Sequence, residues 1–258
     1  MENEMNIVSG KRFLTVLLAV MAILLPLSAT AQTDGSRRKR PKPPTEQTQP
    51  TKKPNRKPAE KKTTLSSPDG YANGHAYVDL GLPSGIKWAT CNVGASSPGE
   101  YGGYYAWGET TTKSSYDESN SLTYGKSVSK LRSAGIIDES GNLTMNYDAA
   151  RANWGGSWRM PTKAELEELK NKCTWDQTSQ DGSNGYKVTG PNGNSIFLPA
   201  AGYRYGTSCH YAEEHGSYWS STLYEGSYSA CYLYFITDIQ YVFWLYRYYG
   251  WSVRPVSE

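Results

Sequence analysis

The clearest hydrophobic periodicity in this chain lies in residues 162–173. Leu166 and Leu169 fall on one face of a helix, while the charged residues between them are left for solvent. Thr162 and Glu165 form a T-x-x-E pattern at the start, in which each side chain can bond the backbone of the other residue. The pattern predicts one well-capped amphipathic helix.

Strand patterns are short and are separated by turn signals. Residues 76–93 read as two strands interrupted by the turn-forming Leu-Pro-Ser-Gly at 82–85. An apolar strand is predicted at 195–199, and alternating strands near the centre of the fold at 230–235 and 251–256.

Elsewhere helix signals are weak. Short helices are expected around 126–135 and 148–153, within or after a polar loop that covers 109–146. Turn sequences (DGSNG, GPNGN) surround residues 186–188. Residues 69–258 therefore predict a single domain of short strands, long structured loops and few helices, long enough to bury a substantial core.

The N-terminus carries the pattern of a secretory signal peptide at residues 1–31. Lys11 and Arg12 precede the apolar run FLTVLLAVMAILLPL, and Ala-Thr-Ala at 29–31 provides the cleavage site. A membrane anchor is the alternative, but the run is short and contains Pro26. We expect export, to the periplasm, the outer surface or the medium, with no transmembrane segment after cleavage.

Composition changes abruptly in residues 32–68. This stretch has eleven Lys or Arg against three acidic residues and no aromatic residue. It cannot bury enough apolar surface to offset chain entropy, so it predicts a disordered, basic, Pro-rich linker. Such a linker is a solvated stalk that can contact anionic components of the cell envelope.

Charge separates the linker from the rest of the chain. The formal net charge is +3, residues 32–68 contribute +8 and residues 1–31 contribute none, so residues 69–258 carry −5. The folded part is mildly acidic, and a specific nucleic-acid-binding domain is not expected.

Six strings occur in order along residues 76–256: VDLGLPSGIKWATCNVGA, YYAWGET, NWGGSWRMPTKAELEEL, FLPAAGYR, GSYWSST and GWSVRPV. Together they resemble the Fibrobacter succinogenes major paralogous domain family, a group of exported proteins common in Bacteroidetes. That family is similar to the formylglycine-generating-enzyme type of C-type-lectin fold. The resemblance implies an α+β, C-type-lectin-like domain with a small twisted antiparallel sheet, two helices and long loops.

The C-terminal segment also resembles the variable region of a target protein of a diversity-generating retroelement. In such systems adenines of a template repeat are randomised, so AAC-type codons yield Tyr, Phe, Ser, Asp or Ile but never Lys, Glu or Trp. Positions reachable from such codons are Tyr224, Tyr228, Ser229, Tyr232, Tyr234, Ile236, Asp238, Tyr241, Phe243, Tyr246, Tyr248 and Tyr249. Residues that resemble a fixed frame, such as Trp219 and Arg247, lie between them, whereas Glu225, Gln240 and Trp244 do not fit the codon rule.

Tyrosine is the dominant aromatic residue of this segment, and it suits a binding surface. Each ring offers a large contact area and a polar tip with few rotatable bonds. The alternative is that these rings are ordinary core residues of strands. In residues 246–249, however, side chains of a strand alternate between faces, so some of the rings must point outward. The candidate ligand-binding residues are Tyr205, His210, Tyr211, Tyr224, Tyr228, Tyr232, Tyr234, Ile236, Asp238, Tyr241, Phe243, Tyr246, Tyr248, Tyr249 and Trp251.

Signals for catalysis or cofactors are weak. The string CHYAEEH at 209–215 has no established zinc spacing, and the E-P-N, Q-P-D and W-N-D strings of calcium-dependent lectins do not occur. An oxidase similar to the formylglycine-generating enzymes would need a close redox-active cysteine pair, and Cys209 and Cys231 are twenty-two positions apart. Cys91 and Cys173 could form a bridge or stay buried, and four cysteines allow three complete pairings.

We therefore expect an exported, non-enzymatic protein without cofactor or metal. Its Tyr-rich, retroelement-diversified surface would bind a protein or glycan on another cell, a phage or a host. The alternative is a structural or adhesin-tip component of a surface assembly with a fixed partner. A formylglycine-generating-enzyme-like oxidase is the third reading.

Overall fold

Strands form most of the regular structure in residues 65–258, the part that the computed structural model describes. The predicted signal peptide and residues 32–64 of the predicted linker lie outside it. The strands are β1 (Gly70–Ala72), β2 (His75–Asp79), β3 (Lys87–Ala89), β4 (Thr174–Gln180), β5 (Ser183–Thr189), β6 (Ser195–Pro199), β7 (Tyr203–Tyr205), β8 (Ser208–His210), β9 (Gly216–Leu223), β10 (Ser229–Ile236), β11 (Ile239–Tyr246) and β12 (Val256–Ser257). The helices are α2 (Val128–Ser133), α3 (Ala149–Trp154) and α4 (Lys163–Lys172), with 3₁₀ turns at Glu118–Asn120 and Met145–Tyr147.

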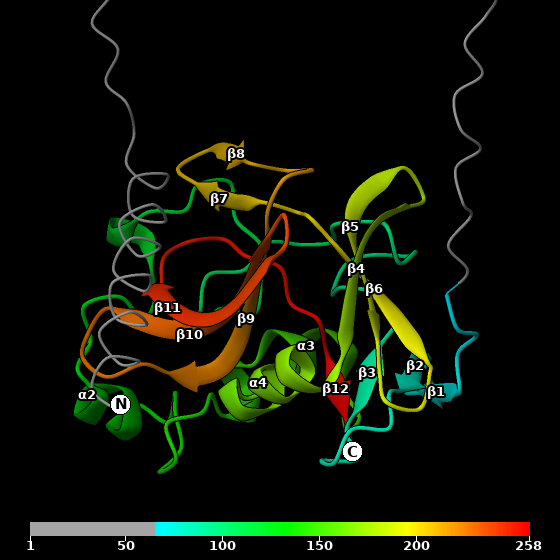
Figure 1. Ribbon diagram of the computed structural model, residues 1–258. Helices are drawn as coiled ribbons and strands as arrows, with labels where there is room; N and C mark the ends of the chain where they lie inside the picture. Colours follow the sequence, from blue (N-terminus) through cyan, green and yellow to red (C-terminus); the bar gives the residue numbers. More distant parts are fainter. Residues whose placement is uncertain (1–64) are drawn as a thin grey trace, which may run out of the picture. The chain divides into compact units, whose positions relative to one another are not determined.

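The strands form several small antiparallel sheets where the sequence predicted one. Their orders are β1-β2-β3-β12, β4-β5-β6, β9-β10-β11 and the β7-β8 hairpin (Figure 1). The architecture is therefore mixed, with few helices and long connections. None of the helices in residues 65–258 is both long and apolar enough to cross a membrane.

The N-terminal boundary of this part differs slightly from the prediction. Ser66 belongs to the predicted linker, yet its Oγ accepts a hydrogen bond from the backbone N–H of Ser195 on β6 at 2.9 Å. The last residues of the predicted linker are thus bonded to the sheet. The prediction of a disordered stretch up to residue 68 is wrong at this end.

The predicted amphipathic helix is confirmed as α4. Thr162 Oγ1 accepts from the N–H of Glu165 at 3.3 Å, and a carboxylate oxygen of Glu165 accepts from the N–H of Thr162 at 2.8 Å. Two further bonds, at 2.7 and 2.8 Å, link that carboxylate to the guanidinium of Arg159. Leu166 and Leu169 are buried, so the apolar face points into the core as the spacing predicts.

The two short helices are also confirmed. α2 lies inside the stretch predicted at 126–135, where the Ser127 side chain caps it. α3 follows Asp148, whose Oδ1 accepts from the N–H of Arg151 at 3.0 Å. Between these helices the polar region is mostly irregular, as expected.

Two predicted apolar strands are confirmed, and a polar hairpin was missed. β6 has the predicted bounds, and β10 extends the predicted stretch by one residue at each end. The β4–β5 hairpin was missed because β4 is largely polar and exposed and was read as turns. Its connection is Asp181-Gly182, both with positive φ (+52° and +87°), the geometry of a two-residue hairpin turn.

The predicted strand at 251–256 is wrong. Trp251 and Ser252 make only isolated bridges, and regular pairing begins at Val256, opposite Trp88. Pro255 has no N–H to donate to a ladder, and the side chain of Arg254 is fully buried among backbone carbonyls. This segment is a buried irregular chain that connects the sheets.

A hydrophobic core cluster lies where α4 meets three of the sheets. Leu166 and Leu169 pack in the same cluster as Leu233 and Phe235 of β10 and Val188 of β5. One face of the β9-β10-β11 sheet is thereby buried under α4. The opposite face carries Tyr232, Tyr234, Tyr241 and Phe243, which are among the aromatic residues that the sequence singled out.

Candidate binding surface

The β9-β10-β11 sheet sorts the C-terminal aromatic residues onto two faces. Residues directly opposite each other on antiparallel strands share a face. Leu233 lies opposite Tyr218 on the face that packs on α4, whereas Tyr232 lies opposite Trp219 and Phe243 on the other face. The period of two therefore separates core residues from candidates for display.

A compact aromatic cluster occupies the centre of that other face. The ring centroid of Trp251 lies 3.8 Å from that of Trp219 and 4.0 Å from that of Tyr232. Tyr232 is 2% exposed and Trp251 is 1% exposed. The predicted display of these two residues is wrong, because their rings form the interior layer beneath the surface.

A continuous chain of ring contacts surrounds this cluster, and we call it the aromatic ribbon. Neighbouring ring centroids along it are 4.6 to 6.5 Å apart, within the range of favourable aromatic pairing. Its members are Tyr124, Tyr203, Tyr205, His210, Tyr211, His215, Tyr228, Tyr234, Tyr246, Tyr248 and Tyr249.

Exposure is concentrated at a few points along the ribbon. Tyr228 is 53% exposed, Tyr205 38% and Tyr211 37%. Tyr246 and His210 are half-buried beside them. The exposed rings mark two ends, with Tyr228 against Tyr124 at one and Tyr211 stacked on His215 at the other.

The remaining rings of the ribbon are mostly covered. Tyr234, Tyr248 and Tyr249 were predicted to be displayed, but all three are buried. Tyr248 and Tyr249 are 4.8 Å apart, and each also contacts Tyr205. Their predicted display is wrong, and they act instead as a rigid support beneath the exposed rings.

The other predicted residues lie on or beside β11. Tyr241 is half-buried and pairs in register with Tyr234 of the ribbon. Phe243 is half-buried opposite Tyr232. Both therefore border the ribbon on the same face of the sheet.

Three predicted residues lie away from this face. Tyr224 stacks on Trp244, with ring centroids 4.5 Å apart and an interplanar angle of 14°. Ile236 and Asp238 lie at the β10–β11 turn, where the N–H of Asp238 donates to the hydroxyl of Tyr186 at 2.9 Å. The tertiary structure does not bring these residues together with the exposed rings.

Sequence reasoning missed three members of the ribbon: Tyr124, Tyr203 and His215, the last of which contacts Tyr211 and Tyr234. Tyr124 lies in the polar loop, where an isolated aromatic residue was the only signal, and it contacts Tyr228, Tyr246 and Tyr248. Tyr203 lies in the string FLPAAGYR, which served only as part of the family resemblance. The contacts of Tyr124 and Tyr203 depend on chain segments that are far apart in sequence.

Arg247 lies beneath the Tyr228 end of the ribbon. Its guanidinium is fully buried 5.7 Å from the ring centroid of Trp107, and Nη2 donates to the backbone carbonyl of Lys126 at 3.2 Å. Nε and Nη1 have no hydrogen-bond partner among the described residues. Burial lowers the pKa of this guanidinium to about 10. It supports the loop that carries Tyr124 and is not itself available at the surface.

Protonation keeps buried phenols of the ribbon uncharged at neutral pH. Burial raises the pKa of Tyr203 and of Tyr248 to about 12, so both phenols stay protonated. Burial lowers the pKa of His215, and nearby Glu214 only partly offsets this. Such a surface makes contacts through ring faces and neutral hydroxyl groups.

Neither a metal cluster nor a redox pair emerges within residues 65–258. No group of three or more His, Cys, Asp or Glu side chains that could hold a metal ion occurs there. Cys91, Cys173, Cys209 and Cys231 are all free thiols. Burial raises the pKa of Cys173 and of Cys231 to about 11, which disfavours the reactive thiolate.

One family matches part of the chain. Residues 159–256 match a family described as a domain of unknown function, DUF8237. The match begins just before α4 and includes the β9-β10-β11 sheet together with most of the ribbon. Comparison with curated proteins and with solved structures gives no match.

Proposed function

We propose that this protein is an exported, non-enzymatic binding protein that contacts a protein or glycan through the exposed rings of the aromatic ribbon. The observation that carries the proposal is the unbroken chain of ring contacts from Tyr228 to Tyr211. Exposed aromatic residues at both ends are seated on buried rings that hold them in place.

Physical chemistry favours binding at such a surface. Exposed aromatic residues gathered together typically mark interaction sites. A tyrosine that is already fixed by its neighbours loses little side-chain entropy when a ligand binds. Its hydroxyl group can still donate and accept hydrogen bonds.

The thiols support a non-enzymatic role. Thiol chemistry needs an accessible thiolate, whereas the high pKa of Cys231 keeps that buried group protonated. Cys209 lies on β8 and Cys231 on β10, in different sheets. An oxidase of the formylglycine-generating type is therefore not the function we propose.

The C-type-lectin-like fold and the retroelement resemblance belong to the same proposal. Few helices, small antiparallel sheets and long loops are compatible with that fold. Diversification would be tolerated at the exposed or half-buried Tyr228, Tyr241 and Tyr246, but hardly at Tyr232, because its ring fills the core. An adenine-specific near-copy of the 3′ coding end beside a reverse transcriptase gene would support it. Without such a copy, the preferred function is that of a surface-assembly component that binds one fixed partner.

Ligand selection tests the ribbon directly. A peptide display library and an immobilised glycan array are screened against the full chain, and affinities are then measured by biolayer interferometry. We expect selected ligands to bind a Tyr205→Ser, Tyr211→Ser, Tyr228→Ser variant at least about tenfold more weakly. Tyr71→Ser is the matched control, since Tyr71 is exposed but outside the ribbon. Ligands that bind the triple variant as well as the wild type would refute the proposal.

Export has its own test. N-terminal sequencing of the protein recovered from the producing cells should begin at Gln32, after cleavage of the predicted signal peptide. Recovery of the uncleaved chain from the cytoplasm would contradict this part of the proposal.

A further inference from the structure

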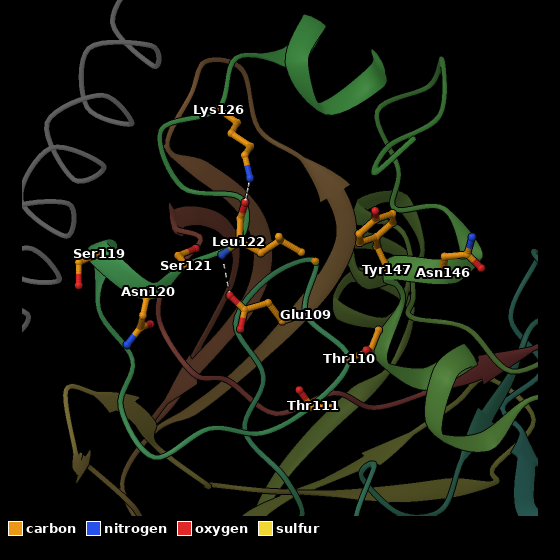
Figure 2. A pocket seen from close by; sticks show the side chains of 11 residues that line it. Glu109, Thr110, Thr111, Ser119, Asn120, Ser121, Leu122, Lys126, Asn146 and Tyr147 are labelled. Atoms are coloured by element: carbon orange, nitrogen blue, oxygen red, sulfur yellow. Dashed lines mark hydrogen bonds between the residues drawn. The ribbon is translucent and has the colours of Figure 1, made fainter. Parts of the chain in front are cut away.

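A polar depression of about 530 Å³ lies near the Tyr228 end of the ribbon, formed by residues that the ribbon does not use. The segment Ser119–Leu122 lines one side, and Asn146 and Tyr147 line the opposite side (Figure 2). Its volume is within the range of small-ligand sites, about 300–1,000 Å³.

Hydrogen bonds hold the walls in place. Glu109 accepts from Lys113 Nζ at 3.0 Å and from the N–H of Leu122 at 2.9 Å. On the other side, Asn153 Nδ2 donates to the carbonyl of Thr110 at 2.9 Å. The depression is therefore preorganised, which limits the entropy lost on binding.

Several polar groups remain available in it. Four side chains of the lining make no hydrogen bond to another residue within 65–258: those of Thr110, Thr111, Asn146 and Tyr147. Two hydroxyl groups, one amide and one phenol thus line the space without a known partner. The carboxylate of Glu109 has further acceptor capacity beyond the two bonds it makes.

Charge and shape restrict what could bind there. The charge of Glu109 is paired with Lys113 at 2.9 Å, and Lys126 Nζ donates to the carbonyl of Leu122. Lys126 is the one cation of this lining, and neither a cluster of cations for a phosphate nor an extended apolar wall for a lipid is found among the lining residues. Hydroxyl, amide and carboxylate groups beside an aromatic ring are the complement of a sugar, which offers hydroxyl groups on its edges and C–H groups on its faces.

We propose that this depression is a calcium-independent subsite for a neutral saccharide unit. Tyr147 would contact the face of the sugar, and Thr110, Thr111 and Asn146 would bond its hydroxyl groups. The subsite stands independently of the proposed ribbon function, because the two surfaces share no residue.

The structure also suggests how a longer glycan would continue. The depression and the ribbon meet in one loop, where Ser121 Oγ accepts from the N–H of Tyr124 at 3.2 Å. Arg247 fixes the same loop through the carbonyl of Lys126. A chain that leaves the depression on this side would pass over Tyr124 and Tyr228, whose ring centroids are 5.0 Å apart.

The test uses an array of neutral and anionic oligosaccharides, screened with the full chain in the presence of a calcium chelator. Titration calorimetry with a neutral array hit should show about tenfold or greater weakening for Thr111→Val, Asn146→Ala, since two partners of sugar hydroxyl groups are removed. Both side chains are exposed, so folding is expected to be unaffected. Tyr71→Ser, an exposed ring outside both the depression and the ribbon, serves as the matched control and should leave the affinity of a short neutral saccharide unchanged.

Three results would overturn the subsite: no neutral hit, hits restricted to anionic glycans, or a neutral hit that the double variant binds normally. Failure of the ribbon proposal gives a different result. In that case the triple tyrosine variant binds like the wild type, whereas Thr111→Val, Asn146→Ala still binds the neutral saccharide more weakly.

Discussion

The ring of Tyr232 lies 4.0 Å from the ring of Trp251, with an interplanar angle of 34°, and both are excluded from solvent. The C-terminal aromatic residues fall into two groups according to their burial. Tyr232 and its neighbours fill the interior, and Tyr228 with its neighbours forms the surface. Residue type alone does not distinguish the two groups, since both consist mainly of tyrosine.

Truncating the two kinds of tyrosine should have different effects on stability. Tyr232→Ala removes a ring packed against Trp219 and Trp251, and we expect the free energy of unfolding to fall by about 3–5 kcal/mol. Tyr228→Ala should change it by less than about 0.5 kcal/mol, as is usual for exposed positions. Urea denaturation of both variants checks this. Equal losses would contradict the division into interior and surface.

The two buried arginines provide a second comparison. Arg254 donates to Asn92 Oδ1 at 2.9 Å and to the carbonyls of Ala89 at 3.0 Å and Phe197 at 2.9 Å. Arg254→Met leaves these acceptors unsatisfied, at about 1–3 kcal/mol each, so we expect a loss of at least about 3 kcal/mol. Guanidinium chloride or urea unfolding gives the value.

Arg247→Met is the matched control for that experiment. Arg247 is equally buried, but within the described residues its guanidinium makes one hydrogen bond and keeps two nitrogens unpaired. Replacing such a group with an apolar side chain of similar length is often close to neutral. We expect a change within about 1 kcal/mol, and a loss as large as that of Arg254→Met would show that the two environments are equivalent after all.

Stability should also fall in mild acid because of His215. Burial between Tyr211 and Tyr234 lowers its pKa below the ordinary 6.5 in the folded state. The unfolded chain therefore binds more protons once the pH falls below about 6.5, and stability decreases from there until the pH reaches the folded-state pKa. His215→Gln should reduce the difference in stability between pH 7.5 and pH 5. Thermal unfolding at several pH values measures both proteins, and parallel curves would disprove the assignment to His215. His75, whose pKa burial also lowers, is present in both.

The capping box of α4 offers a local test. Thr162→Ala removes the acceptor for the N–H of Glu165 and should cost about 1 kcal/mol of unfolding free energy. Thr162→Ser retains the hydroxyl group and should restore most of the stability. If alanine and serine behave alike, the side-chain cap contributes nothing measurable.

Local patterns predicted the elements whose information lies within a few residues. α4 has its own spacing and cap, β6 is a mostly apolar run, and α3 begins at a capping Asp148. The polar β4 escaped prediction because its pairing with β5, rather than its own sequence, makes it a strand. The segment 251–256 failed in the opposite way, since its apolar residues are buried without ladder partners.

The candidate surface was also predictable only in its local features. The sequence by itself determined that the C-terminal segment is rich in tyrosine and that a strand period must separate its rings onto two faces. Only the tertiary structure decided which face is covered, because that depends on α4, on β7 and on the loop that carries Tyr124. Burial is a property of contacts between distant segments, and a strand carries no local signal for the side that its neighbours will cover.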